Sequence, residues 1–346
     1  MKAKGFKKIA IFLALALIFT IFAACSSTEN GGVKEQDSLQ EEENLAEDGQ
    51  TVQEEAEGEE ADAEEEEAEK EEEASFPVEI TDVLGRTVKM EKEPERIVSI
   101  TPSSTEILFA LGLGDKVVAV SNQCDYPEEA QSKEKVGDFY QPNYEQIAAA
   151  EPDLVFIGNA APAEALEKFE ELGLIVVSLE AVDFEGTYQS ILDTGKLTGA
   201  LDKAQEIVED MKQKVKEIEE KVKDAPKPST YFVVSYGEWG NYTAGKGSFI
   251  DELITMAGGR NIAGDVEQKW PEFSLERLVE EDPEVVIISE NANVEEIKSL
   301  EGYKELTAVK EGNLKSITES VVMRPGPRLV EGLELIAKAI HPELLE

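Results

Sequence analysis

The sequence has few of the residues on which most enzyme chemistry depends. It contains a single histidine, His341, and only two cysteines, Cys25 and Cys124. One histidine excludes histidine-based catalytic triads and clustered zinc ligands, and two cysteines are too few for an iron–sulfur cluster. Paired carboxylates carry little information in a chain with 75 acidic residues. We therefore expect no catalytic residue, no metal site and no cofactor, and a protein that is not an enzyme.

Positive charge is also scarce. The chain has 33 Lys and Arg residues against 75 Asp and Glu, a formal net charge of −42. The segment from Ser26 to Ser75 carries 22 acidic and two basic side chains, which leaves −26 for residues 76–346 once four N-terminal lysines are counted. This net negative charge argues against nucleic acid as a partner. The acidic block cannot build a core, so we expect residues 25–75 to be a disordered tether, either a plain spacer or a tail that binds a cation or a partner.

Long apolar runs are absent except at the N-terminus. Four lysines precede a run from Ile9 to Ala24 that is apolar except for Thr20. The run is shorter than the ~20 residues that span a bilayer, so residues 1–24 are predicted to be a signal peptide, with an uncleaved anchor as the alternative. Ala23-Ala24-Cys25 resembles the lipobox of bacterial lipoproteins, which implies a lipidated Cys25 and attachment to the extracytoplasmic face of the cell membrane. Cys124 is then expected to be a packed apolar residue.

From Phe76 onward, apolar runs alternate with helical patterns. VEITD (78–82) and RTVKM (86–90) suggest an opening hairpin. Later runs of strand character alternate with amphipathic stretches, and this alternation predicts an α/β fold with parallel sheets covered by helices. The strand-like runs are RIVSI (96–100), VVAVS (117–121), DLVFIG (153–158), IVVSLE (175–180), TYFVVSYG (230–237), EVVIIS (284–289) and LKSIT (314–318).

A long helix is predicted between two such sets of strands. Apolar residues recur on one helical face, and Pro226 ends the pattern. A helix over 202–223 would be about 33 Å long at 1.5 Å per residue. We therefore expect two lobes, 76–190 and 227–346, joined through the connecting segment 191–226 by a single backbone helix. The residues of the predicted face are Ile207, Met211, Val215, Ile218 and Val222.

The two predicted lobes share a repeated segment. NYEQIAAAEPDLVFI (143–157) aligns without a gap to SLERLVEEDPEVVII (274–288), at a constant offset of 131 residues. The alignment pairs Glu145 with Glu276 and Pro152 with Pro283. If the repeat is structural, the molecule is pseudo-twofold and presents one carboxylate per lobe, which a twofold-symmetric partner could bind at two points.

The stretch GNYTAGKGS (240–248) has the spacing of a phosphate-binding loop, with Gly240, Gly245 and Lys246. Such a loop needs Ser or Thr after the lysine to hold magnesium, and Gly247 occupies that position. Ser248 instead fits the N-cap of the next helix, with Asp251 three residues on. We expect a structural turn here and not a nucleotide site.

Aromatic residues are few, yet several lie in predicted loops. Tyr126, Phe139, Trp239 and Trp270 are among them. Most of these aromatic residues lie in probable loops after strands, where open parallel sheets bind ligands. Each of them could be a local core residue. Together, with both tryptophans in loops, they favour a cleft for a large, flat or apolar ligand.

Five segments together resemble one family. They are similar to the substrate-binding proteins of cobalamin and ferric-siderophore ABC importers, which implies two α/β lobes, a rigid backbone helix and a ligand between the lobes. The resemblance also implies that Glu145 and Glu276 dock onto the two subunits of a twofold-symmetric permease, which works with ATPase subunits. The segments are RIVSITPSSTEILFALGLGDKVVAVSNQCDYP, VGDFYQPNYEQIAAAEPDLVFIGN, AGKGSFIDELITMAGGRNIAG, WPEFSLERLVEEDPEVVII and RPGPRLVEGLELIAKAIHPEL.

Within that family the chain looks most like the cobalamin binders. The resemblance implies that Phe139 and Trp270 face a corrin from opposite lobes, with Tyr126, Trp239 and Arg324 as further pocket residues. The run Asn122-Gln123-Cys124 lacks the tyrosine expected in a cobalamin pocket, so another corrinoid, a ferric siderophore or haem stays open. Haem would take an axial ligand from the tyrosines of these loops. The candidate axial ligands of the haem iron are Tyr126, Tyr140, Tyr236 and Tyr242.

Two rival classes of protein stay open on the same scaffold, a surface enzyme and a structural surface protein.

Overall fold

The computed structural model describes residues 76–158 and 163–345, which all lie in one compact unit that runs from Glu67 to Glu346. The predicted signal peptide 1–24, Cys25 and the acidic segment up to residue 75 lie outside the described residues. No helix in the described part of the chain is long and apolar enough to cross a membrane.

The N-terminal lobe is built on a five-stranded sheet in the order β5-β4-β3-β6-β7, with every neighbouring pair parallel. An antiparallel hairpin of β1 and β2 precedes the sheet, as predicted. The strands are β1 (Val78–Thr81), β2 (Thr87–Met90), β3 (Ile97–Ser99), β4 (Val117–Val120), β5 (Glu134–Lys135), β6 (Leu154–Ile157) and β7 (Val176–Ser178), and the helices between them are α1 (Pro102–Ala110), α2 (Glu128–Gln131), α3 (Tyr144–Ala149) and α4 (Ala163–Glu171).

The C-terminal lobe has a similar plan. Its parallel sheet has the order β10-β8-β11-β12, and β9 pairs antiparallel with β8. The strands are β8 (Ser229–Ser235), β9 (Tyr242–Thr243), β10 (Arg260–Asn261), β11 (Val285–Ser289) and β12 (Leu314–Ile317), and the helices are α7 (Phe249–Met256), α8 (Leu275–Glu281), α9 (Val294–Ser299), α10 (Thr307–Glu311), α11 (Glu319–Met323) and α12 (Leu329–Ile340).

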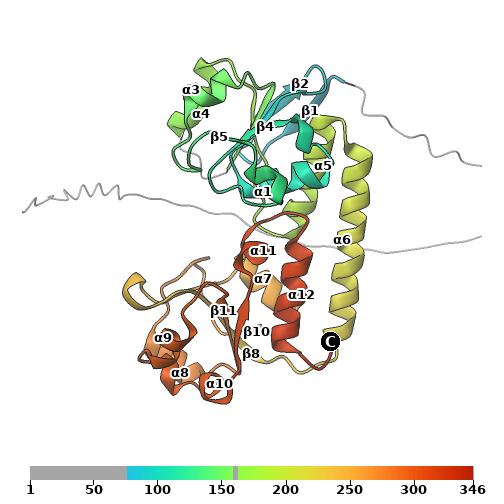
Figure 1. Ribbon diagram of the computed structural model, residues 1–346. Helices are drawn as coiled ribbons and strands as arrows, with labels where there is room; N and C mark the ends of the chain where they lie inside the picture. The colour runs from blue at the N-terminus through green and yellow to red at the C-terminus, as the bar shows by residue number, and fades with distance from the viewer. Residues whose placement is uncertain (1–75, 159–162, 346) are drawn as a thin grey trace, which may run out of the picture. The chain divides into compact units, whose positions relative to one another are not determined.

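Two helices connect the sheets. α5 (Phe184–Thr198) ends at Gly199, whose φ of 74° suits glycine, and α6 (Leu201–Val222) follows at once. α6 packs against α5 and α12 (Figure 1). The predicted helix over 202–223 is thus confirmed to within a residue. Ile207 of the predicted face is partly buried and packs against the core, and Val208 is a further buried residue of the helix.

One hydrophobic core runs along these helices. It includes residues of both sheets, such as Leu154 and Val285, together with Met211 of α6 and Leu333 of α12. Two smaller clusters fill the other faces, one around Ile147 and Val155 and one around Leu278 and Val286. The architecture is the predicted α/β class with parallel sheets and two lobes. α5 crosses residue 190, the expected end of the first lobe; the lobe boundaries stay predictions.

The sequence repeat has a structural counterpart. Asn143 and Ser274 cap α3 and α8, each accepting a hydrogen bond from the backbone N–H three residues on. Both helices end near a residue with positive φ, Glu151 at 48° and Asp282 at 37°. Each is followed by proline and by a central strand of its sheet, β6 or β11. The backbone of 143–157 is therefore repeated element by element in 274–288.

Candidate functional site

One cavity brings together two residues predicted to bind ligand. It has a volume of about 250 Å³ and is lined by Phe139 and Arg324, with Tyr140, Gln123 and Glu180 among their neighbours. Phe139 lies between β5 and α3, and Arg324 follows α11. The Phe139 ring meets the Tyr140 ring edge to face, with centroids 4.7 Å apart. The cavity thus joins an aromatic wall of the N-terminal lobe to a cationic side chain of the C-terminal lobe.

A polar network holds the Phe139 loop. The Gln123 amide nitrogen donates to Asp138, and its oxygen accepts from the backbone N–H of Phe139 at 3.1 Å. The other carboxylate oxygen of Asp138 accepts from the N–H of Tyr140 at 2.8 Å. Gln123, in the run where a cobalamin pocket was expected to have a tyrosine, therefore positions the aromatic residues of the cavity.

Arg324 belongs to a four-residue ion cluster. Its Nη1 lies 3.1 Å from Glu106 Oε1 and 2.6 Å from Asp125 Oδ1, and the Arg328 guanidinium binds Glu106 at 2.6 and 2.9 Å. The Glu106 side chain is only 2% exposed, whereas that of Asp125 is 61% exposed. The hydrogen bond from Arg324 is the main cause that lowers the pKa of Asp125 from its ordinary value. Pro325 and Pro327 exclude a helix between α11 and α12, and this break directs both arginines onto α1.

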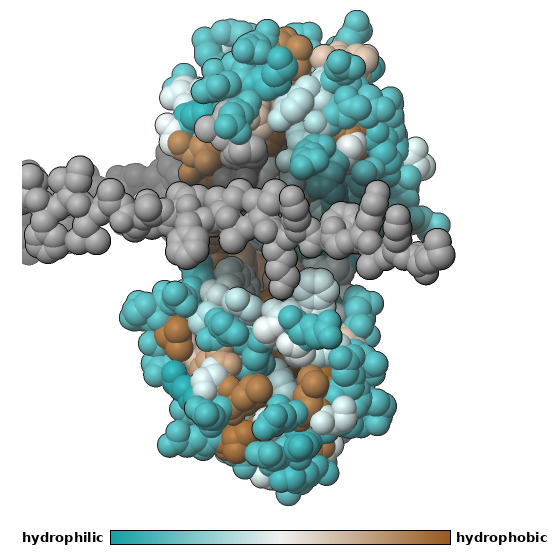
Figure 2. Space-filling model, turned by 90° about the vertical axis from the view of Figure 1, so that its left-hand side faces the viewer, coloured by the Kyte–Doolittle hydropathy of each residue, from teal (hydrophilic) through white to brown (hydrophobic). Residues whose placement is uncertain are grey.

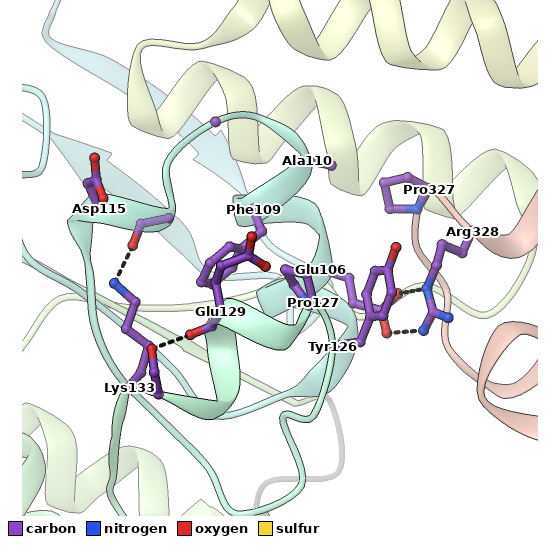
Figure 3. Close-up of a pocket in the computed structure, with 13 residues that line it drawn as sticks. Glu106, Phe109, Ala110, Asp115, Tyr126, Pro127, Glu129, Lys133, Pro327 and Arg328 are labelled. Carbon is purple, nitrogen blue, oxygen red and sulfur yellow. Dashed lines mark hydrogen bonds and ion pairs between the residues drawn. The ribbon is translucent and has the colours of Figure 1, made fainter.

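Tyr126 lies beside a second, larger cavity of about 760 Å³ (Figure 3). The Arg328 guanidinium sits over the Tyr126 ring at 3.7 Å, a cation–π contact that holds the ring next to the ion cluster. On the other side of this cavity, Lys133 Nζ donates to the carbonyl of Gly114 at 2.7 Å. Tyr126 is thus connected to Arg324 through Arg328 and Glu106, although it lines a different cavity.

The two tryptophans lie in two segments of the C-terminal lobe: Trp239 ends the short 3-10 helix η2 (Gly237–Trp239), and Trp270 lies in a loop. Trp239 is 84% exposed and Trp270 is 42% exposed. A bridge between Tyr242 and Glu272 pairs their segments. Trp270 also follows Phe139 by 131 residues, the offset of the repeat, so each lobe has an aromatic residue four positions before the N-cap of its α3 or α8 helix. That Trp270 and Phe139 face one ligand stays a prediction.

The glycine-rich stretch 240–248 makes a structural turn. The N–H groups of Gly245 and Lys246 donate to the carbonyls of Lys269 and Val266, both at 2.9 Å. A Cβ on Gly245 would lie 2.1 Å from the carbonyl oxygen of Gln268, so this close approach requires glycine. Ser248 caps α7 by accepting from the Asp251 N–H. These donors are engaged within the chain and are not arranged to bind a phosphate.

Glu145 and Glu276 occupy matching positions on the surface. Each lies in the first turn of its helix, α3 or α8, and each is exposed. Glu276 borders a cavity of about 660 Å³ together with Glu272 and Glu301. The face of the molecule seen in Figure 2 is largely hydrophilic, with smaller hydrophobic patches. The repeat therefore presents one solvated carboxylate in each lobe.

The sequence analysis missed four residues of this site: Glu106, Gln123, Asp125 and Arg328. A signal existed for two of them. Glu106 is the only charged residue in the apolar helix PSSTEILFA, and a lone buried acid requires a cationic partner. Arg328 stands four residues after Arg324 in RPGPR. Nothing local to Gln123 or Asp125 indicates their contacts, because these depend on how the loops meet.

Comparison with known proteins matches the chain to one family of binding proteins. A family model described as periplasmic binding protein matches residues 97–321. The chain is 35% identical over 274 residues to the uncharacterized ABC transporter substrate-binding lipoprotein YvrC of Bacillus subtilis, covering 78% of this chain and 87% of that protein. It is 30% identical over 280 residues to a cobalamin-binding protein of Halobacterium salinarum, covering 77% and 75%.

Solved structures agree with this family match. The crystal structure of a possible iron-binding, periplasmic solute-binding protein from Staphylococcus epidermidis superposes with a TM-score of 0.65 at 30% identity. The superposition covers 72% of this chain and 100% of that one. The described fold is therefore shared over almost the whole of a solved relative.

Proposed function

The chain belongs to the periplasmic binding protein family, and from this premise we propose that its cargo is cobalamin or another corrinoid. Membership makes it the substrate-binding component of an ABC importer, which carries a transported ligand instead of a cofactor. Members of this family bind ligands for transport and are not enzymes. In the proposed cycle the chain captures the corrinoid and delivers it to a permease driven by separate ATPase subunits.

The observation that carries the proposal is the cavity that combines Phe139 with Arg324. An aromatic face offers apolar area to a macrocycle, and a guanidinium donates hydrogen bonds to the amide oxygens at its edge. At about 250 Å³ the cavity is smaller than the ~300–1,000 Å³ typical of small-molecule sites. It would therefore enclose one edge of a corrinoid, and Trp270 and Trp239 would cover further ligand surface. The similarity to the Halobacterium cobalamin-binding protein supports the same ligand class.

A ferric siderophore or haem is the second candidate. The Staphylococcus epidermidis relative is described as a possible iron-binding protein, and the 69% exposed Tyr140 lines the Phe139 cavity. A tyrosine at this place could supply an axial oxygen to haem iron.

A titration distinguishes the candidates. We expect cyanocobalamin to quench the tryptophan fluorescence of the mature chain with saturation, because both tryptophans are solvent-accessible. Trp239→Phe and Trp270→Phe variants assign the quenching to one residue. Phe139→Ala should weaken cyanocobalamin binding about 10-fold or more, which corresponds to ~1.4 kcal/mol or more. Saturable binding of haemin or a ferric siderophore without any response to cyanocobalamin would establish the second candidate instead.

We also propose that Glu145 and Glu276 dock the loaded protein onto a permease with twofold symmetry. The support is their matching place in the repeat, each exposed in the first turn of its helix. An isologous pair of pockets on the permease would then receive the two carboxylates together.

Attachment to the extracytoplasmic membrane face through lipidated Cys25 is a further part of the proposal. It is supported by the residues before Cys25 and by the similarity to the Bacillus lipoprotein. Two or more acyl chains give stable anchoring. Cys25→Ala should therefore move the protein from the membrane fraction to the soluble extracytoplasmic fraction, and unchanged membrane retention would refute lipidation.

A further inference from the structure

We propose that Asp125, together with Glu106, makes the site selective for neutral or cationic metal chelates and against polyanionic ones. This inference deepens the proposed function, because it concerns the charge of the cargo that the same site accepts. It rests on the ion cluster around Arg324, which lines the Phe139 cavity.

Neither arginine of the cluster is electrostatically free. Arg324 contacts two carboxylates through Nη1, and Arg328 makes two hydrogen bonds to Glu106 while stacking on Tyr126. The two guanidinium charges are therefore compensated by the formal charges of Glu106 and Asp125. An anionic ligand that approached Arg324 would meet a cation already paired with carboxylates of this chain.

The cluster brings no net positive charge to the cavity. The two carboxylates of Glu106 and Asp125 offset the two guanidinium groups of Arg324 and Arg328. A ligand with several ionised groups therefore finds no uncompensated cation in this cluster, whereas a neutral ligand needs only hydrogen bonds and apolar contact.

Of the two carboxylates in the ion cluster, Asp125 is the one that can be replaced without disturbing the fold. Its side chain is 61% exposed, and its partner Arg324 is 19% exposed and lines the cavity. The Glu106 side chain is 2% exposed and forms ion pairs with both arginines. Its removal would leave buried positive charge without this carboxylate partner. Asp125→Asn keeps the size of the side chain and removes one negative charge from Arg324.

The test measures the affinity of the mature chain for three probes of different charge. These are cyanocobalamin, which is neutral, the ferric trihydroxamate ferrioxamine B, which is a cation, and a ferric tris-catecholate, which is a trianion. We expect the wild-type chain to bind the trianion more weakly than at least one of the other two. Asp125→Asn should raise the affinity for the trianion, relative to the affinity for cyanocobalamin, about tenfold. Asp210→Asn, an exposed substitution of the same kind on α6, is the matched control and should change neither.

The outcomes separate this inference from the proposed function. Binding of ferrioxamine B without cyanocobalamin would refute the corrinoid proposal and support the charge selectivity. An Asp125→Asn variant with unchanged affinity for the trianion, relative to the affinity for cyanocobalamin, would overturn the role of Asp125, even if cyanocobalamin binds well. Preferred binding of the trianion by the wild-type chain would overturn the inference as a whole.

Discussion

The segments 143–157 and 274–288 have the same backbone plan but different surroundings. Both begin with a capped helix, place an exposed glutamate in its first turn, and lead through a positive-φ residue and a proline into a central strand. The aromatic residues that precede the two caps differ in setting. Phe139 lines a cavity and touches Tyr140, whereas Trp270 is 42% exposed in a loop paired with β9. The helices that carry the two glutamates are alike, and the loops that precede them are not.

The proposed function offers a physical explanation of this difference. A permease with twofold symmetry would require equivalent contacts from both lobes, which would keep the two helices that carry Glu145 and Glu276 alike. A small-molecule cargo without that symmetry would present different chemical groups to its two sides. Under this proposal the loops that hold the cargo would be free to differ, as the Arg324 ion cluster and the Phe139 loop differ from the Trp270 loop.

The largest effect is expected where the two segments are alike. Glu145→Arg combined with Glu276→Arg should abolish ligand uptake by cells, because each substitution replaces a carboxylate that a permease pocket would receive with a cation. Ligand affinity should stay within about twofold, since neither residue lines the Phe139 cavity.

The matched control is Glu209→Arg combined with Glu219→Arg, which makes the same charge change at exposed positions of α6. Uptake should be retained in this control if the effect depends on position and not on net charge. Loss of ligand affinity in the Glu145/Glu276 variant, or uptake at the wild-type rate, would contradict the docking role.

A second prediction tests whether the lobes are equally well packed. Ile147 and Leu278 hold equivalent positions, and both are fully buried beneath their helices. Ile147→Ala and Leu278→Ala should each lower the free energy of unfolding by about 2–5 kcal/mol through lost burial and a residual cavity. Chemical denaturation measures both changes. Values that differ by more than about 2 kcal/mol would show that the repeat is matched in backbone but not in packing.

The smallest effect is expected at the residues with positive φ. Glu151 and Asp282 both adopt a backbone conformation that favours glycine. Asp282 in addition accepts hydrogen bonds from the Thr307 N–H at 2.7 Å and the Thr307 hydroxyl at 2.6 Å. Glu151→Gly should therefore leave the chain at least as stable as the wild type, whereas Asp282→Gly should cost about 1 kcal/mol or more. Equal changes at the two positions would mean that the Thr307 contacts contribute nothing.

Local patterns predicted most of the fold. The helical spacing of apolar residues predicted α6. The apolar runs that alternate with amphipathic stretches predicted the central strands. Both patterns depend on which face of an element is buried. Short elements such as β5, β9 and β10 were missed, since pairs of residues become strands only through their neighbours in the sheet. Helix α5 was anticipated only in part, within the connecting segment 191–226, because polar and glycine residues such as Thr187, Thr194 and Gly195 occupy much of its buried face.

The site was less accessible to sequence reasoning than the fold. Phe139 and Arg324 could be found because they stand in recognisable segments, and the structure brings them into one cavity. The contacts of Asp125 and Glu106 with Arg324 join residues about 200 positions apart in the chain. Such pairing depends on the meeting of α1 with the segment between α11 and α12, and no local period encodes it.

The hydrophobic core that follows α6 from one sheet to the other has a mechanical consequence. Because buried residues of both lobes and of α6 belong to one hydrophobic cluster, neither lobe should persist when the other unfolds. Calorimetry of the chain should accordingly give one cooperative transition, and a fragment cut within α6 should yield two insoluble or unstructured pieces.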